Sequence, residues 1–381
     1  MQNRIDNAKI FTEEPEKELW RSLLQYSYKA NIQRYYEERH IIGEAEKDNT
    51  DIDLLSNSVA GALLQADEYY KASKTVSLQV EPLLLYYGTT NLLYALYILT
   101  TGKMPNINNH GMHILANGSY KYIADCEIKF DHSKDGGIHQ YAKCLGFSVD
   151  LCRYPKWRLF DFFDSIAEIR DDFERCYMSE KSKVVLLDVV DTPDGVVEKI
   201  FVDEGDIQNV IKNIEGFSSA YLKPQMAHNQ NGQRYYVLRH KMNGTDIQQL
   251  SYSGQPYLQV AHEYDSKLLT IPKELNMYVS LFALGNICRY HPEIWNPFVT
   301  QDSTGEKLLI EKLLYYSRRM LPNIVLNRLL NKNITFVSDK YMPESRIHLV
   351  GEHEVKEIVR AEVQGQIRRE QATNLMNGSR R

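Results

Sequence analysis

The sequence predicts an α+β protein that is mainly α, with a discontinuous helical body and an α+β insertion. Apolar side chains recur at helical spacing through the first hundred residues, and the same spacing returns after residue 273. Between these regions the pattern changes to short alternating runs, as in strands. We therefore expect the N-terminal and C-terminal helices to pack into one body, and we divide the chain into residues 1–105, 106–270, 271–335 and 336–381.

The N-terminal part contains two predicted amphipathic helices. The first covers residues 16–40, where the apolar residues at helical intervals are Leu19, Leu23, Tyr26 and Ala30. The second covers residues 52–77, where the stripe consists of Leu55, Val59, Leu63, Ala66, Tyr70, Ser73 and Val76. An apolar stripe on one side of a helix indicates that this side is buried against a neighbour.

A third helix is expected between Pro82 and Gly102, since proline suits the first turn of a helix and glycine suits its end. It is apolar nearly all round, which is typical of a buried helix. The short preceding loop predicts antiparallel packing on the second helix. Gly88 is unfavourable in mid-helix, so we expect close helix–helix approach there, with Asn91 bonded across the interface. The alternative is that these residues form the polar floor of a pocket.

The middle part is expected to combine hairpins with short helices. Asn117 and Gly118 form a hairpin dipeptide between two alternating runs, and the Thr-Pro-Asp-Gly sequence at residues 192–195 predicts a turn between two more. A helix is expected at residues 161–176, a second helix at 206–214 and a strand at 234–241.

Helical periodicity in the C-terminal part predicts a helix from Lys273 to Pro292, where proline ends it. A further helix is expected over residues 305–330, and Pro322 should kink or divide it. Residues 354–371 carry a narrow valine and isoleucine stripe, which suits docking on the rest of the chain or on a partner helix.

Composition narrows the class of protein. The 381 residues are 43% hydrophobic and 25% charged, with a formal net charge of −5, which argues against a disordered chain and against a uniformly basic surface that coats nucleic acid. The N-terminus lacks the apolar segment of a secretory signal, and the longest apolar runs predict no membrane span. Five cysteines without a CxxC pair indicate free thiols, so we expect a cytoplasmic protein.

Two segments resemble the signature of YaaC-like bacterial proteins. The first runs from Pro82 through Tyr86, Tyr87, Gly88 and Asn91 to Ala95. The second covers residues 278–295, including the Arg-Tyr-His-Pro-Glu sequence at 289–293 and the tryptophan at 295. The order and separation of the segments also fit that family. The resemblance implies a bacterial cytosolic protein with a helical core, and it implies no reaction.

The paired N-terminal helices are also similar, more weakly, to HEPN-type helical domains, many of which are RNases of toxin or phage-defence systems. Such RNases use an arginine and a histidine without a metal, and the resemblance points to Arg34 and His40, separated by five residues. At this spacing His40 must lie just past the helix end for the two to meet. HEPN domains usually build the site across a dimer, so this hypothesis includes RNA as a ligand and a homodimer. The alternative is a solvated helix terminus.

The second charged cluster contains Arg289, Tyr290, His291 and Trp295. As a structural feature, it places cations in the last helical turn, where they interact favourably with exposed carbonyls. As a binding site, Arg289 would contact a phosphate while Tyr290 or Trp295 stacks on a base. If the chain has a ligand pocket, we expect it near Arg289.

We predict no metal site and no cofactor. Six histidines and cysteines lie within 35 residues, but they lack the close spacings of zinc sites: His110, His113, Cys126, His132, His139 and Cys144. Glu127 and Lys129 form an E-x-K pattern found in Mg²⁺ nucleases, although alternating charges are also typical of the exposed side of an edge strand. Nucleotide-binding glycine motifs and the GxSxG motif are absent from the sequence.

Two functions from different classes remain. The first is a non-catalytic binding or regulatory protein that recognises a partner protein or a nucleotide near Arg289. The second is a metal-independent, HEPN-like RNase that uses Arg34 and His40 as a toxin or phage-defence effector. RNA cleavage in EDTA separates the two.

Overall fold

The computed structural model describes residues 7–42, 51–116, 120–132, 136–147, 151–153, 156–178, 180–192, 195–202, 207–229, 231–242, 244–264 and 267–338. Helices make up 53% of the structure and strands 19%, with several small sheets, so the predicted mainly helical α+β class is confirmed. The chain divides into two compact units: of the described residues, the larger contains 7–8 and 19–335, and the smaller contains 9–18 and 336–338.

The bounds of the elements are as follows. The helices are α1 (Pro15–Leu24), α2 (Lys29–Arg39), α3 (Ile52–Ser73), α4 (Glu81–Thr101), α5 (Gly137–Cys144), α6 (Phe160–Phe163), α7 (Arg170–Cys176), α8 (Ile207–Lys212), α9 (Phe217–Ala220), α10 (Lys273–Tyr290), α11 (Pro292–Gln301) and α12 (Glu306–Leu330). The strands are β1 (Asn7–Thr12), β2 (Met112–Leu115), β3 (Glu127–Phe130), β4 (Trp157–Arg158), β5 (Val184–Leu186), β6 (Asp188–Thr192), β7 (Gly195–Ile200), β8 (Gln225–His228), β9 (Arg234–Leu238), β10 (Gln249–Leu250), β11 (Pro256–Gln259), β12 (His262–Tyr264), β13 (Lys267–Leu269) and β14 (Asn333–Ser338).

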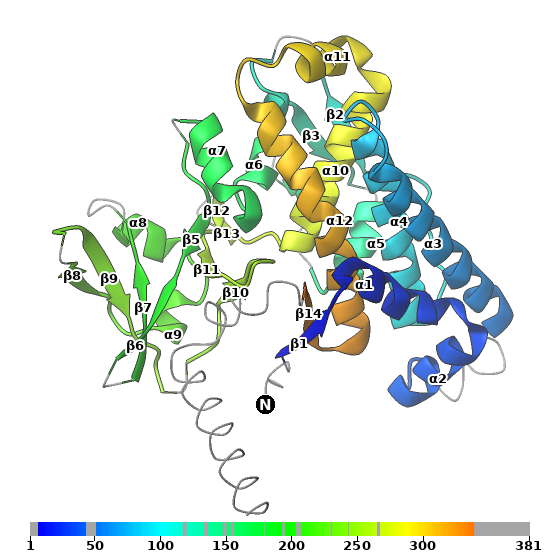
Figure 1. The fold of residues 1–381 in the computed structure, drawn as a ribbon, viewed down its shortest axis with the longest axis horizontal. Coiled ribbons are helices and arrows are strands. Elements are labelled where there is room, and N and C mark those ends of the chain that lie inside the picture. The colour runs from blue at the N-terminus through cyan, green and yellow to red at the C-terminus, as the bar shows by residue number, and fades with distance from the viewer. Residues whose placement is uncertain are drawn as a thin grey trace, which may run out of the picture. The chain divides into compact units, whose positions relative to one another are not determined.

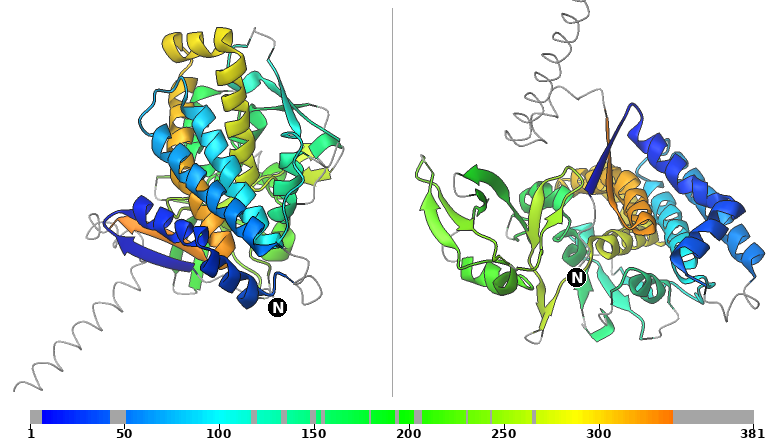
Figure 2. Two further views of the ribbon diagram at one scale, coloured as in Figure 1. Left: turned by 90° about the vertical axis from the view of Figure 1, so that its right-hand side faces the viewer. Right: turned by 90° about the horizontal axis from the view of Figure 1, so that it is seen from below.

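Helix α4 is the centre of the helical part of the larger unit. It contacts α3, α10 and α12, and these helices lie side by side in Figures 1 and 2. Every residue of α4 is buried or partly buried, as its apolar sequence predicts. Among the described residues, α4 is the one helix long and apolar enough to cross a membrane, and the core helix of a soluble protein passes the same test.

Gly88, within α4, and Gly102, at its end, have the roles that the sequence predicted for them. A Cβ at Gly88 would lie 2.7 Å from Cδ2 of Tyr70, so glycine allows α3 and α4 to approach closely, as predicted. Gly102 ends the helix in the left-handed conformation at φ +64°. The prediction for Asn91 was wrong, because its side-chain amide donates to the carbonyl of Tyr87 within the same helix, at 3.0 Å.

The first two predicted helices are shorter than their periodicity indicated. Residues 16–40 form α1 and α2 rather than one helix, because a 3₁₀ turn at Gln25–Ser27 is followed by Tyr28 in an extended conformation. Helix α3 ends at Ser73 and not at residue 77. In both cases apolar side chains continue at helical spacing past a point where the backbone turns, so periodicity alone overestimates the length.

The middle of the chain forms small antiparallel sheets with short helices. The largest has the strand order β6-β7-β9-β8, and β6 pairs with β7 as the predicted hairpin, although the two central turn residues lie outside the described residues. Strands β2, β3 and β4 form another sheet; the Asn117-Gly118 dipeptide lies outside the described residues. The predicted helix at residues 161–176 was wrong in extent, since α6 and α7 are separate. The apolar side chains of β6–β9 and neighbouring elements form a core that includes Ile200, Phe217, Tyr236, Leu238 and Leu258.

The C-terminal helices agree with the expected pattern. Helix α10 ends at Tyr290, and α11 begins at Pro292. Helix α12 contains Pro322 and is continuous through it, so the proline does not divide the helix. Strand β14 pairs with β1 in a two-stranded sheet. The predicted helix at residues 354–371 lies outside the described residues.

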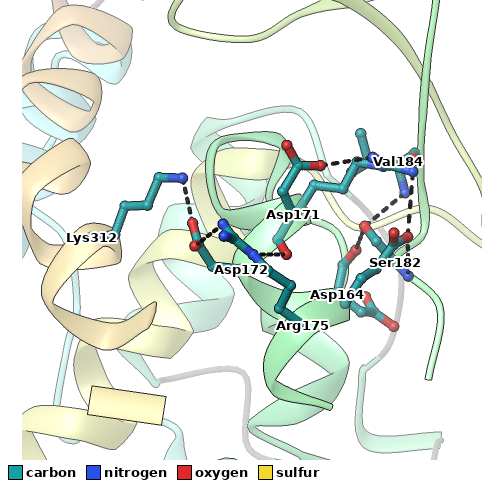
Figure 3. A network of polar contacts seen from close by, with 9 residues as sticks. Asp164, Asp171, Asp172, Arg175, Ser182, Val184 and Lys312 are labelled. Atoms are coloured by element: carbon teal, nitrogen blue, oxygen red, sulfur yellow. Dashed lines mark hydrogen bonds and ion pairs between the residues drawn. The ribbon is translucent and has the colours of Figure 1, made fainter. Parts of the chain in front are cut away.

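Two polar networks fasten α12 to the insertion. Its first residue, Glu306, is only 1% exposed, and its carboxylate accepts hydrogen bonds from the backbone N–H groups of Ile123 (2.6 Å) and Ala124 (2.8 Å) and from the Tyr177 hydroxyl (2.7 Å). Further along α12, Lys312 forms an ion pair with Asp172 of α7. The carboxylate of Asp172 also pairs with the guanidinium of Arg175, at 2.6 Å (Figure 3). These contacts join α12 to the insertion within the larger unit.

Candidate functional site

The two signature segments of the sequence meet where α4 and α10 cross. Gly285 of α10 makes this crossing close, because a Cβ at that position would lie 3.4 Å from Cα of Leu83 and 3.4 Å from Cβ of Tyr86. The ring of Tyr86 therefore packs against Tyr278 and Phe282 of α10, with centroids 5.8 and 5.5 Å apart. The next residue of α4, Tyr87, is only partly buried and lies toward the end of α10.

Arg289 lies in the last turn of α10 with its side chain exposed. Its guanidinium donates a hydrogen bond to the hydroxyl of Tyr87 and lies 4.8 Å from the ring centre of Tyr290. Within the described part of the chain, no carboxylate forms an ion pair with Arg289. Two tyrosines thus position the side chain, and no described carboxylate acts as its counter-ion.

His110 lies beside these residues in the segment that follows α4. Its Nδ1 is 2.6 Å from the hydroxyl of Tyr86, and its ring is 5.5 Å from that of Phe282. Burial, then the positive charge of Arg289 and then His113, lower the pKa of His110 below its usual value of 6.5. Burial among aromatic rings also raises the pKa of Tyr86, so its hydroxyl stays protonated at neutral pH.

We define the α4–α10 surface as Tyr86, Tyr87, His110 and Arg289. It offers a guanidinium, an imidazole whose pKa is lowered, and one partly exposed aromatic ring, that of Tyr87, beside the buried ring of Tyr86. A guanidinium binds two oxygens of a phosphate at once, and aromatic rings stack on bases. Chemically, this combination fits a phosphate-bearing ligand. Sequence reasoning identified Arg289 but did not connect it with His110, which lies 179 positions earlier in the chain.

The other residues that the sequence predicted near Arg289 differ in their contacts and in their exposure to solvent. Tyr290 is 58% exposed and stacks under the guanidinium. His291 joins α10 to α11, with its Nδ1 3.2 Å from a carboxylate oxygen of Glu293. Trp295 is 1% exposed, and its ring packs on Phe298 at 5.1 Å. The structure thus brings Tyr290 to Arg289, while Trp295 lies in the core.

Arg34 and His40 lie on and just after α2. Both side chains are exposed. His40 follows the last residue of α2 in the left-handed conformation at φ 51°, which is the position past the helix end that the Arg–His hypothesis requires. Among the described residues, no contact joins the side chain of Arg34 to that of His40.

Two histidines of the insertion contact the same residue, Asp131, one through its carboxylate and one through its backbone carbonyl. His113 pairs with Asp131 at 2.9 Å, and His139 bonds to the backbone carbonyl of Asp131 at 2.8 Å. Cys126 is buried, and burial raises the pKa of its thiol. Glu127 and Lys129 alternate with buried residues on β3, which is the middle strand of its sheet and not an edge strand as expected.

Three polar clusters were not predicted from the sequence. The first is the cluster around Glu306, described above. Buried Glu198 accepts hydrogen bonds from Tyr221 (2.7 Å), from His240 (2.8 Å) and from Gln248. Asp161, Asp164 and His262 bring three potential metal-ligand atoms within 4.8 Å of one another. These partners lie far apart in sequence, and the only local signal was the three-residue spacing of the two aspartates.

Comparison with known proteins gives a family and no closer relative. The model of a family described as YaaC-like Protein matches residues 24–329, which include α4, α10 and every residue of the α4–α10 surface. A search of curated proteins found no match, and a search of solved structures found none either.

Proposed function

The chain belongs to the YaaC-like family, and from that premise we propose that it is a non-catalytic cytosolic binding protein of a bacterium that recognises a nucleotide through its phosphates at the α4–α10 surface. The observation that carries the proposal is the state of Arg289. Its charge is exposed, positioned by Tyr87 and Tyr290, and not neutralised by any described carboxylate.

Most surface arginines are either mobile or paired with a carboxylate, whereas Arg289 contacts two tyrosines and no described carboxylate pairs with it. Two tyrosines reduce the entropy that Arg289 loses when a ligand binds. The imidazole of His110 adds a second nitrogen donor to the α4–α10 surface. The rings of Tyr87 and Tyr69, whose centres are 5.8 Å apart, are stacked and offer aromatic faces beside Arg289. These features support a ligand that carries both a phosphate and a flat ring. The alternative occupant is an acidic segment of a partner protein.

Calorimetric titration of the full chain with ATP, GTP, AMP and inorganic pyrophosphate tests the proposal. We expect at least one of them to bind, and Arg289→Gln to weaken its affinity roughly 10- to 100-fold, because a charge-assisted hydrogen bond contributes about 1.5–3 kcal/mol. Arg39→Gln is the matched control, since Arg39 also lies in a last helical turn, 5.2 Å from the ring centre of Tyr35. No binding by the wild-type chain, or equal loss in both variants, would contradict the proposal.

A second candidate is the metal-independent RNase, and the position of His40 just past α2 favours it. It predicts cleavage of single-stranded RNA in EDTA that is lost in His40→Ala and in Arg34→Ala. His228→Ala, which changes an exposed histidine of β8, is the control. If no RNA is cleaved by the wild-type protein at concentrations that allow a homodimer, the RNase hypothesis fails while the nucleotide proposal stands.

A further inference from the structure

Asp161, Asp164 and His262 form a second cluster, away from the residues of the α4–α10 surface. Asp161 lies in α6 and Asp164 directly follows it, while His262 is the first residue of β12. One ligand atom from each residue lies within 4.8 Å of the others. The side chains of Asp164 and His262 are 3% and 14% exposed, so the cluster is largely shielded from solvent.

The distances within the cluster are longer than those of good hydrogen bonds. Nε2 of His262 lies 3.5 Å from Oδ1 of Asp164 and 3.5 Å from Oγ of Ser165. Hydrogen bonds to nitrogen are typically about 2.7–3.2 Å long. Two ligands of one metal ion, each about 2.0–2.2 Å from it, are separated by roughly 3.0–3.5 Å. The separation of His262 from Asp164 therefore matches that of two ligands of one ion.

One oxygen of the Asp164 carboxylate already has a donor. The hydroxyl of Ser165 donates to Oδ1 of Asp164 at 2.7 Å. Among the described residues, none donates a hydrogen bond to Oδ2, so the lone pairs of this oxygen are available to a cation.

Surrounding hydrogen bonds hold the carboxylate of Asp161 and the backbone of Asp164. The backbone N–H of Arg158 donates to Oδ2 of Asp161 at 2.7 Å. The backbone carbonyl of Asp164 accepts hydrogen bonds from Ser182 Oγ (2.7 Å) and from the N–H of Lys183 (2.8 Å), the first of which is drawn in Figure 3. Such outer contacts are the support that metal ligands need.

We propose that Asp161, Asp164 and His262 bind one divalent transition-metal ion. Two carboxylates and one imidazole form a donor set of oxygen and nitrogen, which suits Zn²⁺, Mn²⁺ or Co²⁺ and not a soft monovalent ion. The ion would join the end of α6 to the start of β12 and so link segments about 100 residues apart.

Cobalt serves as the probe. The untagged full chain is stripped with EDTA and titrated with Co²⁺, while visible absorption and bound metal per chain are measured. We expect one equivalent, a visible band that Zn²⁺ displaces, and a higher melting temperature with Zn²⁺. His262→Gln and Asp161→Asn should each weaken Co²⁺ binding by at least tenfold and remove the zinc-dependent shift.

The control is His113→Gln, which alters another histidine–aspartate pair, one for which the described residues offer no third ligand, and it should leave Co²⁺ binding unchanged. Arg289→Gln should likewise keep the metal, since the proposed anion site uses different residues. Matching melting curves of the metal-free proteins show that the variants are folded. Failure of the wild-type chain to retain one equivalent, or equal retention by His262→Gln and Asp161→Asn, would overturn the proposal.

Discussion

The guanidinium of Arg289 donates a hydrogen bond to the hydroxyl of Tyr87 across 202 positions of sequence. This bond joins the two segments that carry the family signature. Tyr87→Phe removes the acceptor and leaves the ring. We expect the melting temperature to change little, because the bond is exposed, and nucleotide affinity to fall roughly 2- to 10-fold, because a neutral acceptor contributes about 0.5–1.5 kcal/mol to holding Arg289. Tyr69→Phe, measured by the same calorimetric titration, should have a smaller effect.

The pH dependence of binding should report on His110. A bound phosphate favours the protonated imidazole, so it raises the pKa of His110 from its lowered value in the free protein. Affinity should therefore increase as the pH falls from 8 to 5.5, and His110→Asn should flatten the increase. The comparison of the two proteins with the same nucleotide cancels the titration of the phosphate itself. Parallel curves for the two would exclude His110 from the site.

Two glycines of the α3–α4 pair should respond oppositely to alanine. Gly88→Ala places a Cβ 2.7 Å from Tyr70, a buried ring held by a 2.9 Å hydrogen bond to Thr89, so we expect destabilisation by about 1–3 kcal/mol. Gly61→Ala meets no atom within 4 Å on α3, so it should stabilise the protein by up to about 1 kcal/mol. Urea unfolding measures both, and equal effects would argue against close packing at Gly88.

Glu306 should make stability depend on pH. Its burial raises the pKa to about 7 from 4.5, against the opposing effect of its three hydrogen bonds. Because the folded pKa is the higher one, protonation favours the folded state. The contribution is full below pH 4.5 and is lost as the pH rises through about 7, a decrease on the order of 3 kcal/mol.

Urea unfolding of wild type and Glu306→Gln at pH 4.5 and pH 8 checks this sign. The stability difference, wild type minus variant, should be larger at pH 4.5. A difference that is constant, or larger at pH 8, would show that the carboxylate is ionised in the folded protein throughout this range.

The helical part of the fold was predictable where several local signals agreed. Pro82, the apolar residues after it and Gly102 each indicate the same helix, and the structure has it within one residue at each end. The break at Tyr28 could not be predicted, because the apolar spacing of residues 16–40 continues through it. The conformation of one residue, extended at φ −98° and ψ 123°, ends a helix that the side-chain pattern would allow to continue.

The candidate site was only partly predictable for a related reason. Arg289 could be predicted as a binding residue because it is a charged residue within the second signature segment. Its partner Tyr87 was predicted only to lie on a buried helix, because a helix that is apolar nearly all round does not show which side reaches the surface. The partnership of His262 with Asp161 and Asp164 depends on tertiary packing alone. Neither propensity nor spacing records contacts between residues a hundred positions apart.

Helix α4 has consequences for how the chain is synthesised. Its partner α3 leaves the ribosome first, but α10 begins roughly 170 residues after α4 ends. At a translation rate of about 5–20 residues per second, roughly 10–35 s pass between the synthesis of α4 and that of α10, and during this time α10 cannot cover the apolar face of α4. The nascent chain is therefore exposed to aggregation during the translation of the whole insertion, and a chain that terminates before Lys273 would retain α4 with this face uncovered.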